Sequence, residues 1–106
     1  MLIDTHCHLD FKDFDPDRDQ VIKRARDAGI GLIINVGSSI EGSRRSVELA
    51  DKYDFIYASV GAHPHDAQRL DEAAFKELKK LASSPKVVAI GEVGLDYYRN
   101  LSPSPD

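Results

Sequence analysis

Residues 2–10, LIDTHCHLD, join a short apolar segment to two histidines that are one residue apart. In an extended strand successive side chains point to opposite faces, so His6 and His8 share a face, roughly 6.5–7 Å apart along the backbone. Two imidazoles so placed can converge on one ion, at nitrogen–metal distances of about 2.0–2.1 Å for zinc. Cys7 points to the other face and is not expected to be a ligand. A pair of surface or capping histidines is the alternative interpretation.

Three further apolar segments are typical of strands in a buried parallel sheet. The first of them is apolar on both faces except at Asn35. Strand–helix units of about 30 residues, repeated three times and followed by a fourth strand, favour parallel strands with right-handed crossovers. An open doubly wound sheet and the first half of an eight-stranded barrel both fit this order. The predicted strands are 32–36, 55–60 and 87–90, after the one that begins with Leu2 and Ile3.

Capping residues and apolar stripes predict three helices between these strands. Asp15 is the expected N-cap of the first helix, and Gly29 lies just past its end. Ser38 and Glu41 resemble a capping box for the second helix. Asp71 is the expected cap of the third. The apolar stripes are Val21, Ile22, Ala25 and Ala28, then Val47, Ala50 and Tyr53, then Phe75, Leu78 and Leu81 or Ala82.

The composition is that of an ordinary globular domain, with 30% charged and 42% apolar residues in a chain of 106. No apolar run approaches the 20 or so residues that cross a bilayer, and the start lacks the basic region of a signal peptide. A single cysteine gives no disulfide framework, so a cytoplasmic location is expected. The 14 basic and 18 acidic residues give a net charge of −4. Any contact with nucleic acid should therefore be short, local and bridged by metal.

Two more of the predicted strands are followed by histidine or glutamate, residue types that can bind metals or transfer protons. Glu92 comes after the fourth strand, and His63 and His65 come after the third. The carboxyl ends of parallel strands lie at one edge, where α/β active sites are built. A carboxylate there can bridge two metal ions about 3.5–4 Å apart, so His6, His8 and Glu92 are predicted metal ligands. His63 or His65 could donate a proton or hold a phosphate oxygen, unless they only bond the backbone or face solvent.

Three segments together resemble the signatures of one family: DTHCHLD at 4–10, VGAHPH at 60–65 and AIGEVGLDYYR at 89–99. They are similar to those of TatD-type hydrolases, metal-dependent deoxyribonucleases of the amidohydrolase-like barrel superfamily. The resemblance covers almost the whole chain, and the run around Glu92 is its most specific part. It implies an α/β fold of parallel βα units, the N-terminal half of a TIM-like (β/α)8 barrel with four strands and three helices.

The resemblance also implies roles for individual residues. His6 and His8 match ligands of one metal, and Glu92 matches the carboxylate that binds or bridges two divalent ions, which would be zinc, manganese or magnesium. His63 matches a histidine beside the site. Arg99 lies in a segment where a cation could meet a substrate phosphate, so both residues are expected to bind substrate. No residue of the chain is matched to the catalytic acid or base.

A complete barrel usually needs about 250 residues, and the family's remaining ligands, further histidines and an aspartate, lie on later strands. We therefore expect residues 1–99 to form a partial barrel domain and residues 100–106 a frayed tail. The first and fourth strands would each have an unpaired edge. Truncation is the favoured explanation, and the missing C-terminal half of the barrel or a second copy of the chain is the expected partner.

Hydrolysis of DNA phosphodiester bonds is the expected activity of the intact enzyme. The 106-residue chain alone is expected to be weak or inactive, because the family's general base comes from a later strand. Two alternatives stay open from the sequence. One is an amidohydrolase-like enzyme acting on a C–N or ester bond, and the other is a non-catalytic half-barrel fragment whose strand edges recruit a partner.

Overall fold

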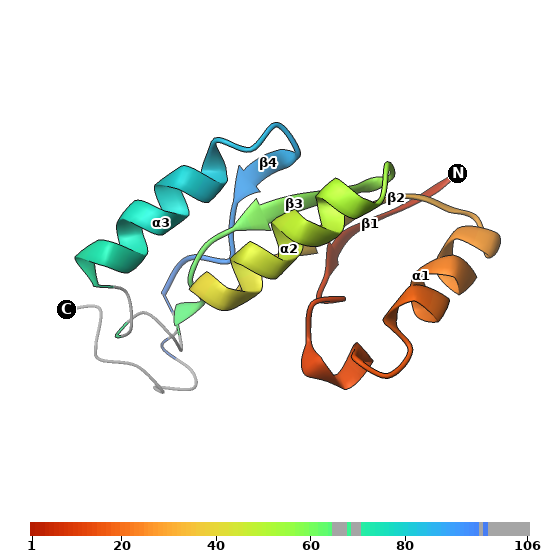
Figure 1. Ribbon diagram of the computed structural model, residues 1–106, viewed down its shortest axis with the longest axis horizontal. Helices are drawn as coiled ribbons and strands as arrows, with labels where there is room; N and C mark the ends of the chain where they lie inside the picture. Colours follow the sequence, from red (N-terminus) through yellow and green to blue (C-terminus); the bar gives the residue numbers. More distant parts are fainter. Residues whose placement is uncertain (65–67, 69–70, 96, 98–106) are drawn as a thin grey trace.

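Four parallel strands alternate with three α-helices in the computed structural model, which describes residues 1–64, 68, 71–95 and 97 (Figure 1). In the sheet the strands stand side by side in chain order. A doubly wound sheet would reverse its order at a switch point, whereas this order is that of a barrel segment. The strands are β1 (Leu2–Cys7), β2 (Ile30–Val36), β3 (Ile56–Val60) and β4 (Val87–Ile90); the helices are α1 (Arg18–Asp27), α2 (Ile40–Lys52) and α3 (Glu72–Ala82), with a short 3-10 helix, η1 (Lys12–Phe14).

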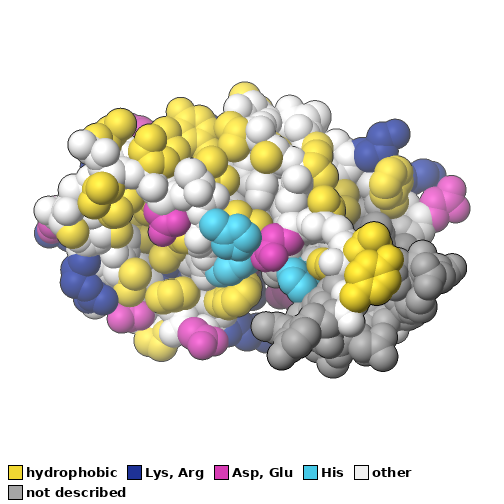
Figure 2. Space-filling model, turned by 180° about the vertical axis from the view of Figure 1, so that it is seen from behind, with side chains coloured by type: hydrophobic (Ala, Val, Ile, Leu, Met, Phe, Trp, Pro, Cys, Tyr) yellow, Lys and Arg dark blue, Asp and Glu magenta, His cyan; other side chains and the backbone are white. Residues whose placement is uncertain are grey.

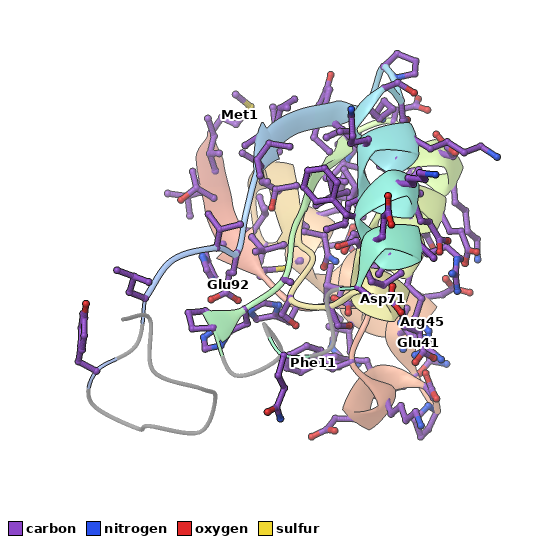
Figure 3. The ribbon with its side chains drawn as sticks, turned by 90° about the vertical axis from the view of Figure 1, so that its left-hand side faces the viewer. Met1, Phe11, Glu41, Arg45, Asp71 and Glu92 are labelled. Atoms are coloured by element: carbon purple, nitrogen blue, oxygen red, sulfur yellow. The ribbon has the colours of Figure 1, made fainter. Side chains whose placement is uncertain are left out.

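The hydrophobic core lies between the sheet and the helices on one of its faces. Side chains alternate between the two faces of a strand, and Ile33 of β2 with Ile56 and Ala58 of β3 are buried in the core. Ile34 and Tyr57, which point to the other face, are only half-buried. Figure 3 shows α2 and α3 on the same side of the sheet. The core comprises Leu9, Ile22, Ile33, Val47, Leu49, Ala50, Ile56, Ala58 and Val60.

The opposite face of the sheet and its two edges are open in the described part of the chain. Figure 2 shows apolar side chains across this bare face. In β1, Leu2 and Ile3 are 62% and 52% exposed, and in β4, Val88 and Ile90 are 53% and 62% exposed. Exposed apolar surface of this kind is typical of interfaces. Among the described residues there is no helix that is both long and apolar enough to span a membrane.

Two helices begin later than the sequence predicts. Helix α1 has Asp17 at its N-cap, not Asp15. The predicted cap follows η1, and its carboxylate is engaged by the guanidinium of Arg18 2.5 Å away, so it is not free to cap the helix. Helix α2 is capped by Ser39, whose hydroxyl accepts from the backbone N–H of Gly42 at 2.9 Å. The capping box predicted at Ser38 is therefore wrong by one residue.

Two other local predictions, the cap of α3 and the glycine after α1, are confirmed. The carboxylate of Asp71 accepts a hydrogen bond from the backbone N–H of Ala74 at 2.8 Å and caps α3. Gly29 follows α1 with a φ of +103°, a conformation that favours glycine. The predicted apolar stripe of α1 is buried at Ile22, but Ala28 is exposed.

Candidate metal centre

Two histidines from the end of β1 and a glutamate from the end of β4 meet on the bare face of the sheet. Their ligand atoms all lie within 4.8 Å of one another. Nε2 of His6 and Nε2 of His8 are 3.2 Å apart. One oxygen of Glu92, Oε2, lies 3.1 Å from Nε2 of His8 and 3.6 Å from Nε2 of His6. The three ligands predicted from the sequence are therefore brought together. Figure 2 shows histidine and acidic side chains side by side on this face.

The backbone after β4 crosses toward β2 and so carries Glu92 to the histidines. The backbone N–H of Glu92 donates to the carbonyl oxygen of Gly37, just past β2, at 2.7 Å. On this path it passes directly over Gly61 at the end of β3. A Cβ at position 61 would lie 2.7 Å from the carbonyl oxygen of Glu92, closer than real contacts allow. Glycine at position 61 therefore lets β4 reach across β3.

The imidazole of His8 is held with its Nε2 toward Glu92. Its Nδ1 lies 2.9 Å from the carbonyl oxygen of Val36, which can only accept a hydrogen bond. Nδ1 therefore donates this hydrogen bond, and Nε2 is the ring nitrogen that faces the ligand group. The ring also stacks on Phe11, with centroids 4.6 Å apart and planes 14° from parallel.

The chemistry of this donor set fits a divalent ion. Two imidazole nitrogens and one carboxylate oxygen suit zinc or manganese, and magnesium less well. Cys7 is excluded from the set, as the alternation of the strand predicts. Its Sγ lies 3.8 Å from Oδ1 of Asn35, and burial raises the pKa of the thiol to about 11, so it stays protonated.

His63 lies beside the ligand group. Its Nε2 is 3.6 Å from Oε1 of Glu92, whereas the contact to His8 is made by Oε2. Its backbone N–H donates to the carbonyl oxygen of Ser38 at 2.8 Å. Arg99 and His65, the other residues singled out in the sequence, lie outside the described residues.

Two buried polar residues behind the site were not assigned a role from the sequence. Asn35 and Asp10 are 0% and 4% exposed, and Nδ2 of Asn35 donates to Oδ1 of Asp10 at 2.9 Å. Burial raises the pKa of the Asp10 carboxyl, and the hydrogen bond from Asn35 opposes this shift. The sequence did contain a signal for Asn35, because it is the single polar residue in an otherwise apolar strand.

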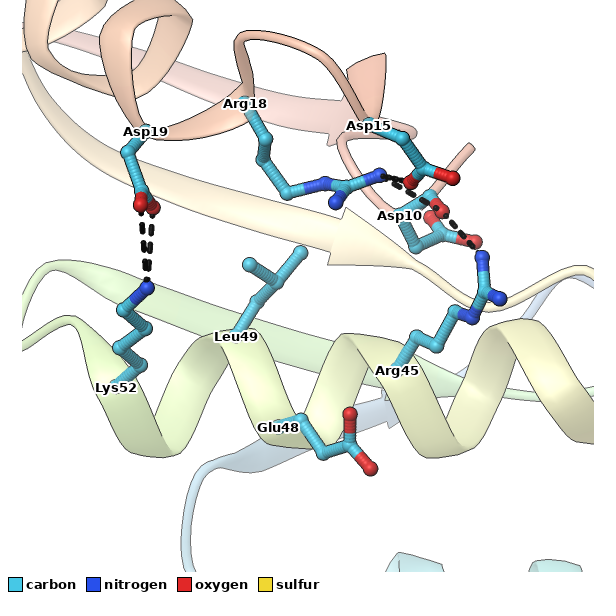
Figure 4. A pocket seen from close by; sticks show the side chains of 8 residues that line it. All are labelled: Asp10, Asp15, Arg18, Asp19, Arg45, Glu48, Leu49 and Lys52. Carbon is cyan, nitrogen blue, oxygen red and sulfur yellow. Dashed lines mark hydrogen bonds and ion pairs between the residues drawn. The ribbon is translucent and has the colours of Figure 1, made fainter. Parts of the chain in front are cut away.

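A groove of about 380 Å³ between α1 and α2 is lined by charged side chains (Figure 4). The two arginines that line it are hydrogen-bonded to backbone carbonyl oxygens of the chain itself. Arg18 donates to the carbonyl oxygens of Leu9 and Phe11 at 2.6 and 2.9 Å, and Arg45 donates to that of Asp10 at 3.2 Å. The groove thus anchors the turn that follows His8. Its lining residues are Asp10, Asp15, Arg18, Asp19, Arg45, Glu48, Leu49 and Lys52.

Comparison with known proteins gives one consistent match. The family model described as "TatD related DNase" matches residues 3–106. The chain is 44% identical over 103 residues to the uncharacterized metal-dependent hydrolase YabD of Bacillus subtilis, covering 97% of this chain and 40% of that protein. It is 42% identical over 101 residues to the 3'-5' ssDNA/RNA exonuclease TatD of Cronobacter turicensis, covering 95% of this chain and 38% of that protein.

Two solved structures that resemble the chain also belong to TatD proteins. The crystal structure of YJJV, a TatD homologue from Escherichia coli, superposes with a TM-score of 0.83 at 37% identity, over 93% of this chain and 39% of that one. A TatD-family hydrolase from Entamoeba histolytica superposes with a TM-score of 0.87 at 28% identity, over 98% of this chain and 40% of that one. The chain therefore spans about 40% of the length of the relatives that it matches.

Proposed function

Because the chain belongs to the TatD-related DNase family, we propose that it forms the metal-binding portion of a hydrolase that cleaves phosphodiester bonds in DNA. The observation that carries the proposal is the contact between ligands from the two ends of the described chain. Oε2 of Glu92 lies 3.1 Å from Nε2 of His8. Two histidines that meet a carboxylate at the carboxyl edge of a parallel sheet favour a metal site over a pair of surface histidines.

We propose that Glu92 serves two metal ions. Its Oε2 faces His6 and His8, while its Oε1 is turned toward His63. One carboxylate that offers an oxygen on each side can bridge two ions. Divalent ions bound there would supply the positive charge that activates water and neutralises the phosphate.

His63 is the proposed contact to the substrate phosphate. Its side chain is 26% exposed and lies at the rim of the ligand group, 3.6 Å from Glu92. From there its ring can hydrogen-bond a phosphate oxygen that approaches the metals. Arg99 is proposed for the same task on the resemblance of its segment alone. With a net charge of −4, the protein would hold DNA locally at this site.

The bare face of the sheet is proposed to be covered by the remaining strands of a barrel. The chain spans about 40% of its relatives, and the exposed Leu2 and Ile90 lie on the two edge strands. Closing the sheet on itself would pair both edges and bury this face. The further metal ligands and the general base would come from those strands, so the 106-residue chain alone is proposed to be weak or inactive. A cytoplasmic location is also proposed, in keeping with the single cysteine.

Native mass spectrometry of the purified chain, before and after addition of manganese or zinc, tests the proposal. Retention of metal by the wild-type chain and its loss in His8→Ala support a metal centre on this chain, and Glu77→Gln on α3 is the control. A wild-type chain that retains no metal contradicts it. A dimer with a fixed number of metals would mean that a second copy, and not further strands, covers the bare face.

The substrate class is tested with a panel assayed with manganese: single-stranded DNA, RNA, a small phosphodiester, a carboxylic ester and an amide. The chain is assayed alone and after mixing with the C-terminal portion of the Bacillus subtilis relative. Chelator-sensitive cleavage of the phosphodiesters, restored by mixing, is the expected result. Cleavage of the amide or ester instead would contradict the assignment as a nuclease.

A further inference from the structure

The end of β2 provides no ligand to the metal centre, but it bonds to His8 and to the residues on both sides of it. Oδ1 of Asn35 accepts from the backbone N–H of Leu9 at 2.6 Å and from the thiol of Cys7 at 3.8 Å. The next residue, Val36, accepts from Nδ1 of His8 at 2.9 Å. Three consecutive residues, the last of β1 and the two that follow it, are thus hydrogen-bonded to two consecutive residues of β2.

The side chain of Asn35 is fixed on its other side as well. Its Nδ2 donates to Oδ1 of Asp10 at 2.9 Å and to Oγ of Ser46, on α2, at 2.7 Å. The amide is 0% exposed, so water does not replace a missing partner. Only one orientation of the amide satisfies these contacts, since a flipped amide would place its N–H groups against the N–H of Leu9.

We propose that Asn35 is a positioning residue for the metal centre. It holds the turn around His8 so that Nε2 faces Glu92, while the carbonyl of Val36 keeps the hydrogen on Nδ1. A hydrogen-bond partner on the second nitrogen is what orients a histidine that binds metal. The inference depends on the proposed function for the metal itself, but the orientation of His8 is a property of the metal-free chain.

The first test reads the imidazole of His8 directly, in long-range proton–nitrogen NMR spectra of the metal-free chain at pH 8. Wild type is expected to show His8 protonated on Nδ1. Asn35→Leu, which removes every polar contact of the amide, is expected to lose the hydrogen-bonded Nδ1–H signal, because the ring is no longer held against the carbonyl oxygen of Val36. The matched control is Ser46→Ala, which removes one buried contact of Asn35 on the helix side and leaves its bond to Leu9. The control should keep the wild-type spectrum.

A second pair of variants covers the case in which Asn35→Leu does not fold. Asn35→Asp keeps the oxygen that accepts from Leu9, but it places a carboxylate against Asp10 and is expected to disturb His8. Adding Asp10→Asn restores a donor and an acceptor at this contact with their positions exchanged, and should return the His8 spectrum to that of wild type. Wild-type spectra in every Asn35 variant would overturn the inference.

Metal affinity is then compared by competition with a chelator, using manganese or cobalt. Loss of a partner behind a metal ligand typically weakens binding about 10–100-fold, and we expect a loss in this range for Asn35→Leu. Ser46→Ala should change affinity by less than about threefold, although it also removes a buried hydrogen bond. If wild type binds no metal, the proposed metal function fails, while the NMR comparison still decides the role of Asn35.

Discussion

Glu92 and His8 come from opposite ends of the described chain, but a carboxylate oxygen of the first lies 3.1 Å from Nε2 of the second. The contact depends on the crossing of the backbone over Gly61, where a side chain would lie 2.7 Å from the Glu92 carbonyl oxygen. His63 approaches the other carboxylate oxygen at 3.6 Å. A single carboxylate therefore joins the ends of β1, β3 and β4.

Replacing this carboxylate by an amide of the same shape should weaken metal binding. We expect Glu92→Gln to lower the affinity for manganese or zinc at least about tenfold, or ~1.4 kcal/mol, because a neutral amide is a poor substitute for a charged ligand. Titration calorimetry measures the change. Glu77→Gln, which removes a carboxylate of α3 paired with Arg44, is the matched control and should bind metal as wild type does. Equal affinity in Glu92→Gln and wild type would remove Glu92 from the site.

Arg18 should stabilise the fold more than its place at the start of a surface helix suggests. Its guanidinium donates to the carbonyl oxygens of Leu9 and Phe11 at 2.6 and 2.9 Å, and the side chain is 23% exposed. Hydrogen bonds to charged groups contribute roughly 1.5–3 kcal/mol each, so Arg18→Gln should lower the free energy of unfolding by about that much. Urea denaturation checks this.

The control for that experiment is Arg24→Gln on the same helix. Arg24 is 67% exposed and 3.9 Å from the carboxylate of Asp17, a surface pair that is expected to contribute less than about 1 kcal/mol. Equal losses for the two arginine variants would show that the bonds of Arg18 to the turn after β1 add nothing to stability.

The contact of Asp19 with Tyr53 and Lys52 predicts a pH dependence of stability. The hydrogen bond from the Tyr53 hydroxyl, and then that from Lys52, lower the pKa of the Asp19 carboxyl. Its folded pKa is therefore below its unfolded value of about 3.9. The stabilisation is fully present above the unfolded value and is lost as the pH falls through the folded pKa.

Asp19→Asn removes this pH-dependent contribution. The difference in unfolding free energy between wild type and Asp19→Asn should be constant near neutral pH and should shrink below about pH 4. Denaturation curves from pH 7 to pH 2.5 measure it. Tyr53→Phe removes the strongest of the hydrogen bonds and should abolish part of the same trend. A difference that grows as the solution is acidified would reverse the assigned sign.

Two apolar residues on neighbouring strands should differ sharply in their contribution to stability. Ile56 of β3 is 0% exposed and Val88 of β4 is 53% exposed. Ile56→Ala should cost about 2–5 kcal/mol through lost packing and a cavity, and Val88→Ala less than about 0.5 kcal/mol. Thermal or urea denaturation compares them. A large loss in Val88→Ala would show that a partner covers β4 in solution.

Much of the fold could be predicted because its signals are local. The alternation of apolar strands with amphipathic helices gave the order of the elements, and Asp71 and Gly29 marked helix ends correctly. The cap predicted at Asp15 was wrong because Arg18, which binds the preceding turn, also engages its carboxylate. No local pattern records such a competing partner. The local pattern could not separate a barrel segment from a doubly wound sheet. The family resemblance implied the barrel, and the strand order of the structure agrees with it.

The sequence by itself determined that His6 and His8 point the same way, because the two-residue period of a strand fixes the direction of its side chains. Its resemblance to a family implied that Glu92 binds metal together with these two histidines. Only the tertiary structure decided that Glu92 reaches the histidines across a glycine, and that Asn35 binds the residues on either side of His8. The physical reason is that these contacts join residues far apart in the chain. Their distances depend on how the strands stack and curve in space, which no local spacing specifies.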